Sequence, residues 1–195
     1  MLWWSVDAFR KFDPDIRIVL VVHPDFLDRW SELLEGEERE ERGGGPDFMK
    51  VKGGESRIES VKNALRELAG EEIGGEEATV FIHDAARPFV TPDLIRRGSA
   101  EVKEGRGAVP VVALSDSIRI IIPGGTKAVD RSHYVAVQTP QVFRLSDIRK
   151  AYDALADTTG MTDDASVAEN FGLEIVTYKG DTNNFKITNP EDFRR

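Results

Sequence analysis

The stretch FIHDAARPFV, residues 81–90, decides the fold. An apolar run from Ala78 to Ile82 breaks off there into His83 and Asp84, and Arg87 follows three residues later. Strands that are buried on both faces have such continuous apolar runs. In open α/β sheets, ligands bind at the carboxyl ends of the strands. The stretch therefore predicts a buried strand whose tip carries a binding site.

The first half of the chain repeats a strand followed by a helix. Strands are predicted at 16–22, up to Lys52, at 79–83 and at 107–114, and a helix is expected to begin near Pro24. Residues 2–12 have the apolar spacing of a helix that packs on a sheet. This alternation predicts an α/β protein with a Rossmann-like, doubly wound, mostly parallel sheet.

Helix-start signals support these elements. Ser56 and Glu59 have capping-box spacing, and Thr91 before Pro92 is a typical N-cap. Thr162 is expected to be the N-cap of a short helix that ends before Gly172, and strands are expected at 173–180 and 184–188. The charged, glycine-rich segment 36–47 is expected to be a solvated loop.

Residues 115–137 depart from the alternation. Apolar and β-branched runs flank Pro123-Gly124-Gly125, which predicts a long hairpin, here called the β-arm. Protruding arms of this kind commonly form dimers. We therefore expect a homodimer.

The composition narrows the class of protein. A chain of 195 residues, 40% hydrophobic, is best explained as one domain. Its formal net charge of −9 argues against nucleic-acid binding, and the absence of cysteine excludes disulfides and cysteine-bound zinc. No apolar run reaches the length of a membrane span, so we expect a cytoplasmic protein without a membrane partner.

Polar groups follow several predicted strands, and each group allows two interpretations. Gly53-Gly54 either lets backbone N–H groups approach a ligand or is an ordinary turn. Arg87 either binds a phosphate as a fork or pins the loop through Asp84. Thr162 either contacts an anion or caps its helix, and Lys186 either contacts a ligand or extends to solvent. Asp163 and Asp164 are explained most simply as first-turn acids, and His83 as a satisfied strand-end histidine.

The sequence lacks the motifs of several enzyme classes. The sequence contains no G-x-G-x-x-G after a strand, no G-x-x-x-x-G-K-[ST], no H-E-x-x-H and no G-x-S-x-G. Dehydrogenases, P-loop enzymes, zinc proteases and α/β-hydrolases therefore have no support. Two cations, several hydroxyls and a carboxylate at one sheet edge suit a phosphorylated substrate with a metal nucleotide.

The sequence resembles the 2-C-methyl-D-erythritol 4-phosphate cytidylyltransferase family of the non-mevalonate isoprenoid pathway. The resemblance rests on segments in the family's order, from about Leu2 onward: GGESRIESVKNAL, IHDAARPFV, VPVVALSDSIR, VDRSHYVAVQTPQVF, MTDDASVAENFG and NNFKITNPEDF. It implies a single nucleotidyltransferase domain over 1–195 that joins CTP and methylerythritol phosphate and releases pyrophosphate, with Mg2+ bound mainly by the CTP phosphates. No protein ligand for a metal is identified.

The resemblance also implies roles for individual residues. Lys186, Asp84 and Arg87 would be catalytic. Asp84 and Arg87 would hold the methylerythritol end of the substrate, and Thr162 and Lys186 would contact phosphate. The nucleotide site would contain Gly54, Glu55, Ser60 and Ala85, and Thr139 would help to close it. Ser117, where the family often has Thr, and Arg131 would reach from the β-arm into the partner's site, with arm exchange in the homodimer.

The start of the sequence departs from the family. The family opens with a strand and a loop of the form Ala-Ala-Gly-x-Gly-x-Arg, followed by Pro-Lys-Gln. We therefore expect the N-terminal nucleotide-binding segment to be missing and the activity of the chain as printed to be weak or absent. Two alternatives stay open. One is a ribitol-5-phosphate cytidylyltransferase, which Asp-Ala-Ala-Arg at 84–87 disfavours, and the other is a noncatalytic truncated homologue.

Overall fold

The computed structural model describes residues 1–30, 48–70 and 77–194. Their elements are, in chain order, α1 (Leu2–Phe12), β1 (Ile18–Val22), the 3-10 helix η1 (Pro24–Phe26), β2 (Phe48–Lys52), α4 (Arg57–Gly70), β3 (Thr79–Ile82), α5 (Pro92–Glu101), β4 (Arg106–Ala113), β5 (Arg119–Ile122), β6 (Gly125–Ala128), η2 (Arg131–His133), β7 (Val135–Val137), β8 (Gln141–Arg144), α6 (Leu145–Asp153), α7 (Asp164–Phe171), β9 (Glu174–Lys179) and η3 (Pro190–Arg194). The loop expected at 36–47 lies outside the described residues.

The main sheet has five strands, in which β8 lies between β3 and β4, and β4 also pairs with β7 and β9. β8 is antiparallel to both β3 and β4, whereas β9 is parallel to β4, so β3, β4 and β9 run in one direction. β7 is antiparallel to β4. The parallel strands are those that helical crossovers connect, as expected for an α/β fold.

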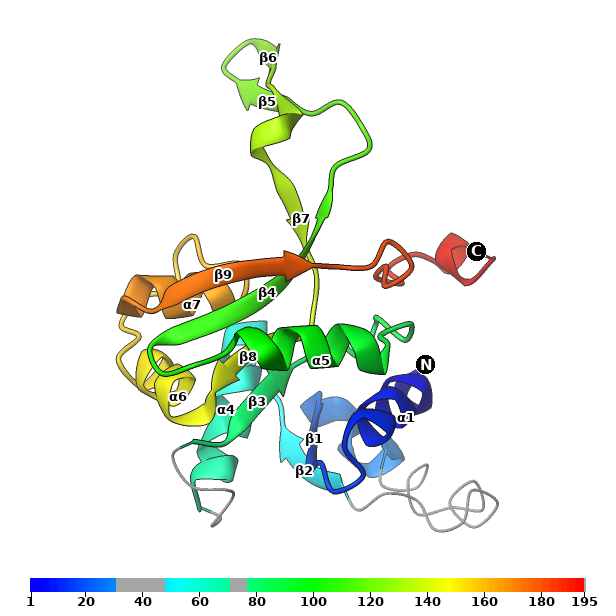
Figure 1. Cartoon of the computed structure of the whole chain (residues 1–195), viewed down its shortest axis with the longest axis vertical. Coiled ribbons are helices and arrows are strands. Elements are labelled where there is room, and N and C mark those ends of the chain that lie inside the picture. Colours follow the sequence, from blue (N-terminus) through cyan, green and yellow to red (C-terminus); the bar gives the residue numbers. More distant parts are fainter. Residues whose placement is uncertain (31–47, 71–76, 195) are drawn as a thin grey trace.

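Helices cover both faces of this sheet (Figure 1). On one face, Phe9 of α1 and Leu94 of α5 belong to a buried cluster with Tyr178 of β9. On the other face, α4, α6 and α7 pack around Phe143 of β8. The predicted α/β, Rossmann-like, doubly wound architecture is confirmed.

β1 and β2 form a separate parallel pair. The pairing runs in register from Ile18 opposite Phe48 to Val22 opposite Lys52. Within the described residues, no strand pairs with the edge of β1 away from β2 or with the edge of β3 away from β8. The two sheets therefore lie near each other without a shared hydrogen-bond ladder.

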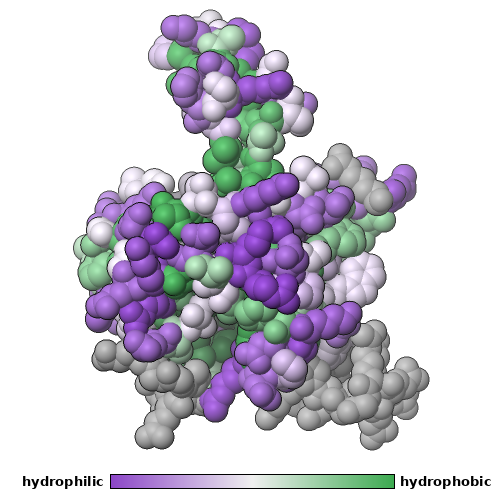
Figure 2. All heavy atoms as spheres, viewed as in Figure 1, coloured by the Kyte–Doolittle hydropathy of each residue, from purple (hydrophilic) through white to green (hydrophobic). Residues whose placement is uncertain are grey.

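The β-arm projects from the body as a lobe on a narrow stalk (Figures 1 and 2). Its tip is the antiparallel β5–β6 hairpin, with Gly124 at a φ of 81° in the turn. Ile120, Ile121 and Ile122 are exposed, and Ile121 reaches 85%. The predicted hairpin is confirmed, and its use in a dimer stays a prediction.

Two local predictions are wrong. Asp163, not Thr162, is the N-cap of α7, because its carboxylate accepts from Ser166 N and the Ser166 hydroxyl accepts in return from Asp163 N. Residues 184–188 form no strand, since their backbone groups bond elsewhere: Asn184 N donates to Asp181 O, and Ile187 N donates to Ala86 O. The predicted cap at Thr91 is confirmed.

Gly107 of β4 is buried where the sheet meets the Phe143 ring. A Cβ added at Gly107 would lie 2.3 Å from that ring. We expect Gly107→Ala to lower the free energy of unfolding by about 1–3 kcal/mol, because the buried ring must shift. Urea denaturation measures this, with Gly125→Ala as the control, since a Cβ there meets nothing within 4 Å. Equal stability of the two variants would contradict the predicted crowding.

Candidate active site

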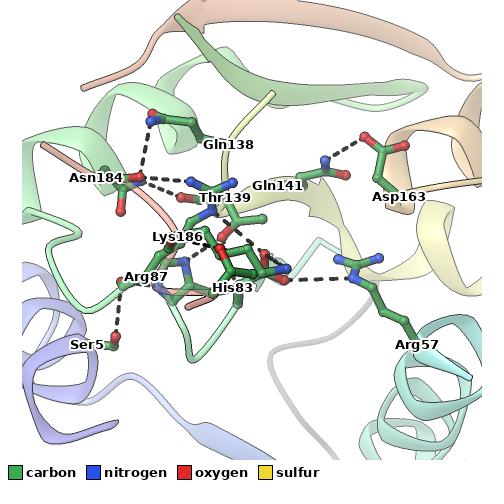
Figure 3. A network of polar contacts seen from close by, with 12 residues as sticks. Ser5, Arg57, His83, Arg87, Gln138, Thr139, Gln141, Asp163, Asn184 and Lys186 are labelled. Atoms are coloured by element: carbon green, nitrogen blue, oxygen red, sulfur yellow. Dashed lines mark hydrogen bonds and ion pairs between the residues drawn. The ribbon is translucent and has the colours of Figure 1, made fainter. Parts of the chain in front are cut away.

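The Asp84 carboxylate follows the carboxyl end of β3 and has three cations near it. Figure 3 labels these cations, which are Arg57, Arg87 and Lys186. Lys186 Nζ is 3.1 Å away, Arg87 Nε 3.7 Å and Arg57 Nε 3.8 Å. Burial opposes ionisation of Asp84, but its hydrogen bond and charge interaction with Lys186, helped by the two arginines, outweigh burial and lower its pKa. Asp84 is therefore a carboxylate at neutral pH.

His83 and Thr139 hold the Asp84 loop from inside the protein. The Thr139 hydroxyl accepts from Asp84 N at 3.0 Å and lies 3.0 Å from His83 Nδ1. His83 Nε2 lies 3.1 Å from the Arg87 carbonyl, which can only accept, so Nε2 carries the proton and Nδ1 accepts from Thr139. Burial lowers the pKa of His83 to about 4. A neutral His83 thus connects both ends of the loop, as a satisfied strand-end histidine would.

Arg87 lies mostly buried beside Asp84. Its guanidinium donates to Asn184 O at 2.9 Å, and the Asn184 side chain donates to Thr139 O at 2.8 Å. The Gln138 amide also bonds to Asn184 O and to Asp181. These contacts support the interpretation in which Arg87 pins the loop. They also order the segment that carries Lys186.

Arg57 and Asp164 were not predicted as site residues, yet they connect α4 and α7 to Asp84. Arg57 bonds to Asp164 at 2.5 Å, and Tyr152 donates its hydroxyl to the same carboxylate at 2.6 Å. Asp164 is fully buried. The sequence contained one signal for Arg57. A cation in the first turn of a helix interacts unfavourably with the helix dipole, so an arginine at that position indicates a further interaction. The partner, 107 positions away, could not be found from spacing.

The predicted nucleotide residues are Gly54 and Glu55 on the turn between β2 and α4, Ser60 within α4, and Ala85 beside Asp84. Ser60 accepts from Gly54 N at 3.0 Å, and Glu55 N donates to Glu59 at 2.9 Å. A Cβ on Gly54 would overlap the Glu59 side chain. The turn interpretation of Gly53-Gly54 is thereby supported. Ser60 and Ala85 line the same cavity as Asp84.

The remaining predicted residues lie further out. Ser117 and Arg131 belong to the projecting β-arm, where Arg131 donates to Ser115 O. Thr162 is exposed and precedes the α7 N-cap, two residues before Asp164. The structure therefore gathers Asp84, Arg87 and Lys186 in one cluster. The β-arm, to which Ser117 and Arg131 belong, projects away from the body of the same chain (Figure 1).

The cluster can bind an anion. Arg57, Arg87 and Lys186 carry three positive charges against those of Asp84 and Asp164, which leaves one positive charge. The described residues hold no group of three or more His, Cys, Asp or Glu side chains placed for a metal ion. None of the described helices has the length and apolar character needed to cross a membrane.

Comparisons with known proteins identify the family of the chain. The family model for 2-C-methyl-D-erythritol 4-phosphate cytidylyltransferase matches residues 1–195. A relative of that name from Bacteroides fragilis is 36% identical over 194 residues, which is 100% of this chain and 83% of the relative. Another, from Geobacillus kaustophilus, is 39% identical over 96% of this chain and 78% of its own length.

Solved structures give the same result. A 4-diphosphocytidyl-2C-methyl-D-erythritol synthase superposes with a TM-score of 0.80 at 27% identity, over 99% of this chain and 86% of the other. The Thermus thermophilus cytidylyltransferase has a TM-score of 0.71 at 26% identity, over 99% and 85%. The fold and the family match together define a nucleotidyltransferase enzyme. Within this class, the chain belongs to the 2-C-methyl-D-erythritol 4-phosphate cytidylyltransferase family.

His83 predicts a pH dependence of stability. Its pKa is about 4 in the folded protein against 6.5 ordinarily, so between these values the unfolded chain binds more protons. This contribution is complete above pH 6.5 and is lost as the pH falls towards 4, by about 3 kcal/mol at most. We expect His83→Gln to flatten the decline in unfolding free energy over this range, measured by urea denaturation. His133→Gln, on the exposed arm, should keep the wild-type slope. An unchanged slope in His83→Gln would refute this role.

Substitution of Arg57 is predicted to lower the free energy of unfolding strongly. In Arg57→Met the fully buried Asp164 carboxylate loses its cation, and we expect a loss of about 3–5 kcal/mol in unfolding free energy. Adding Asp164→Asn removes the unpaired charge and should restore part of this loss. Arg66→Met, exposed on the same helix, is the control. Additive effects of the two substitutions, measured by denaturation, would show that Arg57 and Asp164 are not coupled.

Proposed function

We propose that the chain transfers the cytidylyl group of CTP to 2-C-methyl-D-erythritol 4-phosphate, giving 4-diphosphocytidyl-2-C-methyl-D-erythritol and pyrophosphate. An oxygen of the acceptor phosphate attacks the α-phosphorus of CTP, and the bond from that phosphorus to the bridging oxygen of the β-phosphate breaks. The pyrophosphate leaves with this electron pair. The observation that carries the proposal is the convergence of three cations on Asp84 at the strand ends.

Lys186 contacts the phosphate that is transferred. Its ammonium group has three donors, of which Asp84 takes one, and its side chain is 44% exposed. A cation held in place by a carboxylate stabilises charge that develops in the transition state without having to reorganise. Thr162, near the N-terminus of α7, adds a hydroxyl for the same phosphate.

Asp84 accepts from hydroxyls of the methylerythritol end, and Arg87 is the positioning residue that keeps its loop in place. The nucleotide lies along Gly54, Glu55, Ser60 and Ala85. Thr139 accepts a hydrogen bond from the Asp84 backbone N–H and so supports the loop that carries Asp84 and Ala85.

Mg2+ enters with the triphosphate of CTP. Magnesium keeps several waters and is bound by substrate phosphates with few protein ligands, which suits a cluster rich in cations and poor in carboxylates. When bound, it neutralises charge on the phosphates. The protein side chains of the cluster neutralise the rest.

The β-arm forms a homodimer by arm exchange, and its Ser117 and Arg131 reach the site of the partner. Support comes from the exposed isoleucines of the arm and from its projection away from its own site. An arginine fork suits a phosphate group.

The test is pyrophosphate release with CTP, magnesium and methylerythritol phosphate. We expect Lys186→Ala to lower kcat by about 100-fold or more, because it removes a cation at the transferred phosphate. Lys179→Ala, exposed at the end of β9, is the matched control and should leave the rate unchanged.

Two outcomes would overturn the proposal. Faster release with ribitol 5-phosphate would assign the other acceptor. The chain should also be assayed when preceded by the strand and glycine-rich loop with which the family opens. No release in either form, with no calorimetric binding of CTP, would favour the noncatalytic alternative.

A further inference from the structure

Three aromatic side chains from separate parts of the chain meet near the candidate active site. The Phe89 ring contacts both others, with its centroid 5.8 Å from that of Trp4 in α1 and 5.1 Å from that of Phe185. Trp4 is 58% exposed and Phe89 37%, and Phe185 is half-buried. We call Trp4, Phe89 and Phe185 the aromatic row. It lies outside the two buried core clusters, so packing of the core does not explain it.

The aromatic row joins two segments that carry cations of the site. Phe89 lies two residues after Arg87, and Phe185 directly precedes Lys186. Both cations approach the same Asp84 carboxylate, Arg87 Nε at 3.7 Å and Lys186 Nζ at 3.1 Å. Contact between the Phe89 and Phe185 rings therefore keeps the backbone of Lys186 close to the loop after β3.

The backbone at Phe185 and Lys186 has few polar contacts. The chain is tied to the body on either side of them: the Asn184 carbonyl accepts hydrogen bonds from two side chains, and Ile187 N donates to the loop after β3. Within residues 1–30, 48–70 and 77–194, by contrast, neither Phe185 N nor Lys186 N donates a hydrogen bond. The ring of Phe185 is thus the main contact that can fix this pair of residues.

The position of the Lys186 backbone matters because the lysine side chain is long. Its four-carbon stem is flexible and 44% of the side chain is exposed, so a single ion pair with Asp84 restricts the ammonium group only weakly. A charge stabilises a transition state best when it is already in place, and a displacement of about 1 Å can cost about 100-fold in rate. Fixing the start of the side chain limits where the ammonium group can go.

We propose that Phe185 is a positioning residue for Lys186, and that its contact with Phe89 holds the Lys186 ammonium group beside Asp84. Trp4 contacts Phe89 and so connects α1 to the same row. The inference rests on the proposed function in one respect, namely that Lys186 acts on the transferred phosphate.

The first measurement does not need activity. The full chain is treated with N-hydroxysuccinimide acetate, and mass spectrometry follows acetylation of Lys186 relative to the exposed Lys179. We expect Phe185→Ala to speed acetylation of Lys186 by about threefold or more, because the ion pair with Asp84 then shields the amine less. Phe185→Leu keeps an apolar contact with Phe89 and should stay within about twofold of the unaltered chain.

The matched control is Phe171→Ala, which removes a ring that is 43% exposed at the end of α7. It should leave the acetylation of Lys186 unchanged. If Phe185→Ala fails to fold, Phe89→Ala removes the other ring of the contact and should speed the acetylation of Lys186 in the same way.

The second measurement is the rate of pyrophosphate release. We expect Phe185→Ala to lower kcat by about tenfold with little change in the KM for CTP, because a displaced cation affects the transition state more than binding. In a chain that already carries Lys186→Ala, Phe185→Ala should lower kcat no further. If the unaltered chain releases no pyrophosphate, the proposed function fails, whereas the acetylation still decides the position of Lys186.

Three outcomes would overturn the inference. The first is unchanged acetylation of Lys186 in Phe185→Ala. The second is an equal increase at Lys179, which would show a general loosening of the fold. The third is a further loss of kcat when Phe185→Ala is added to Lys186→Ala, which would show that Phe185 acts through another group.

Discussion

The Asp84 carboxylate is the charge on which the arrangement of the site depends. Arg57 comes from α4, Arg87 from the loop after β3 and Lys186 from the segment after β9, so three parts of the chain meet through one anion. Three cations this close would repel one another in a partly buried place, where charges are weakly screened. Asp84, their common counter-ion, holds the three elements close together. The cations keep further N–H donors that can bind a second anion.

Several segments around Asp84 have no regular secondary structure, but they are buried and hydrogen-bonded. Thr139 and Asn184 lie in segments without helix or strand, yet both are buried. Side-chain bonds to backbone take the place of a ladder, as in the contacts of Asn184 with Thr139 and of Gln138 with Asp181. Buried backbone groups need partners, and here amide side chains supply them. This explains how Lys186 can be held on a segment that is not a strand.

Local patterns in the sequence predicted most elements, because their causes are local. The apolar spacing of 2–12 gave α1, Thr91 with Pro92 gave the start of α5, and residues around Gly124 gave the hairpin. The secondary-structure prediction was wrong where contacts with residues distant in the sequence determine the conformation. Residues 184–188 have a β-branched, apolar composition, but Ile187 bonds to the loop at Ala86. Tertiary contact overrides strand propensity in such cases.

The candidate site shows the same division. Asp84, Arg87 and Lys186 could be named from strand ends and from the family resemblance. Asp164 is in the first turn of α7, as predicted, but its second role as the buried counter-ion of Arg57 was not predicted. Periodicity reports which face of an element is apolar, but not which charge meets a buried carboxylate.

The separation of β1 and β2 from the main sheet links fold and site. The apolar sequence of β1 is that of an interior strand, and both strands formed as predicted. Among the described residues, β1 pairs only with β2 and β3 only with β8. Strand tips at the carboxyl edge are positioned by their ladders, so Asp84 after β3 is fixed by β8 on one side only. The turn at Gly53-Gly54 is fixed to β1 through the bond from Gly53 N to Val22 O. α4 packs on β1 and β2, and its Arg57 pairs with Asp84 and Asp164, so this ion-pair group is one of the contacts that join the two halves of the site. α1 is another, because its Trp3 contacts Phe48 of β2 and its Phe9 contacts Phe81 of β3.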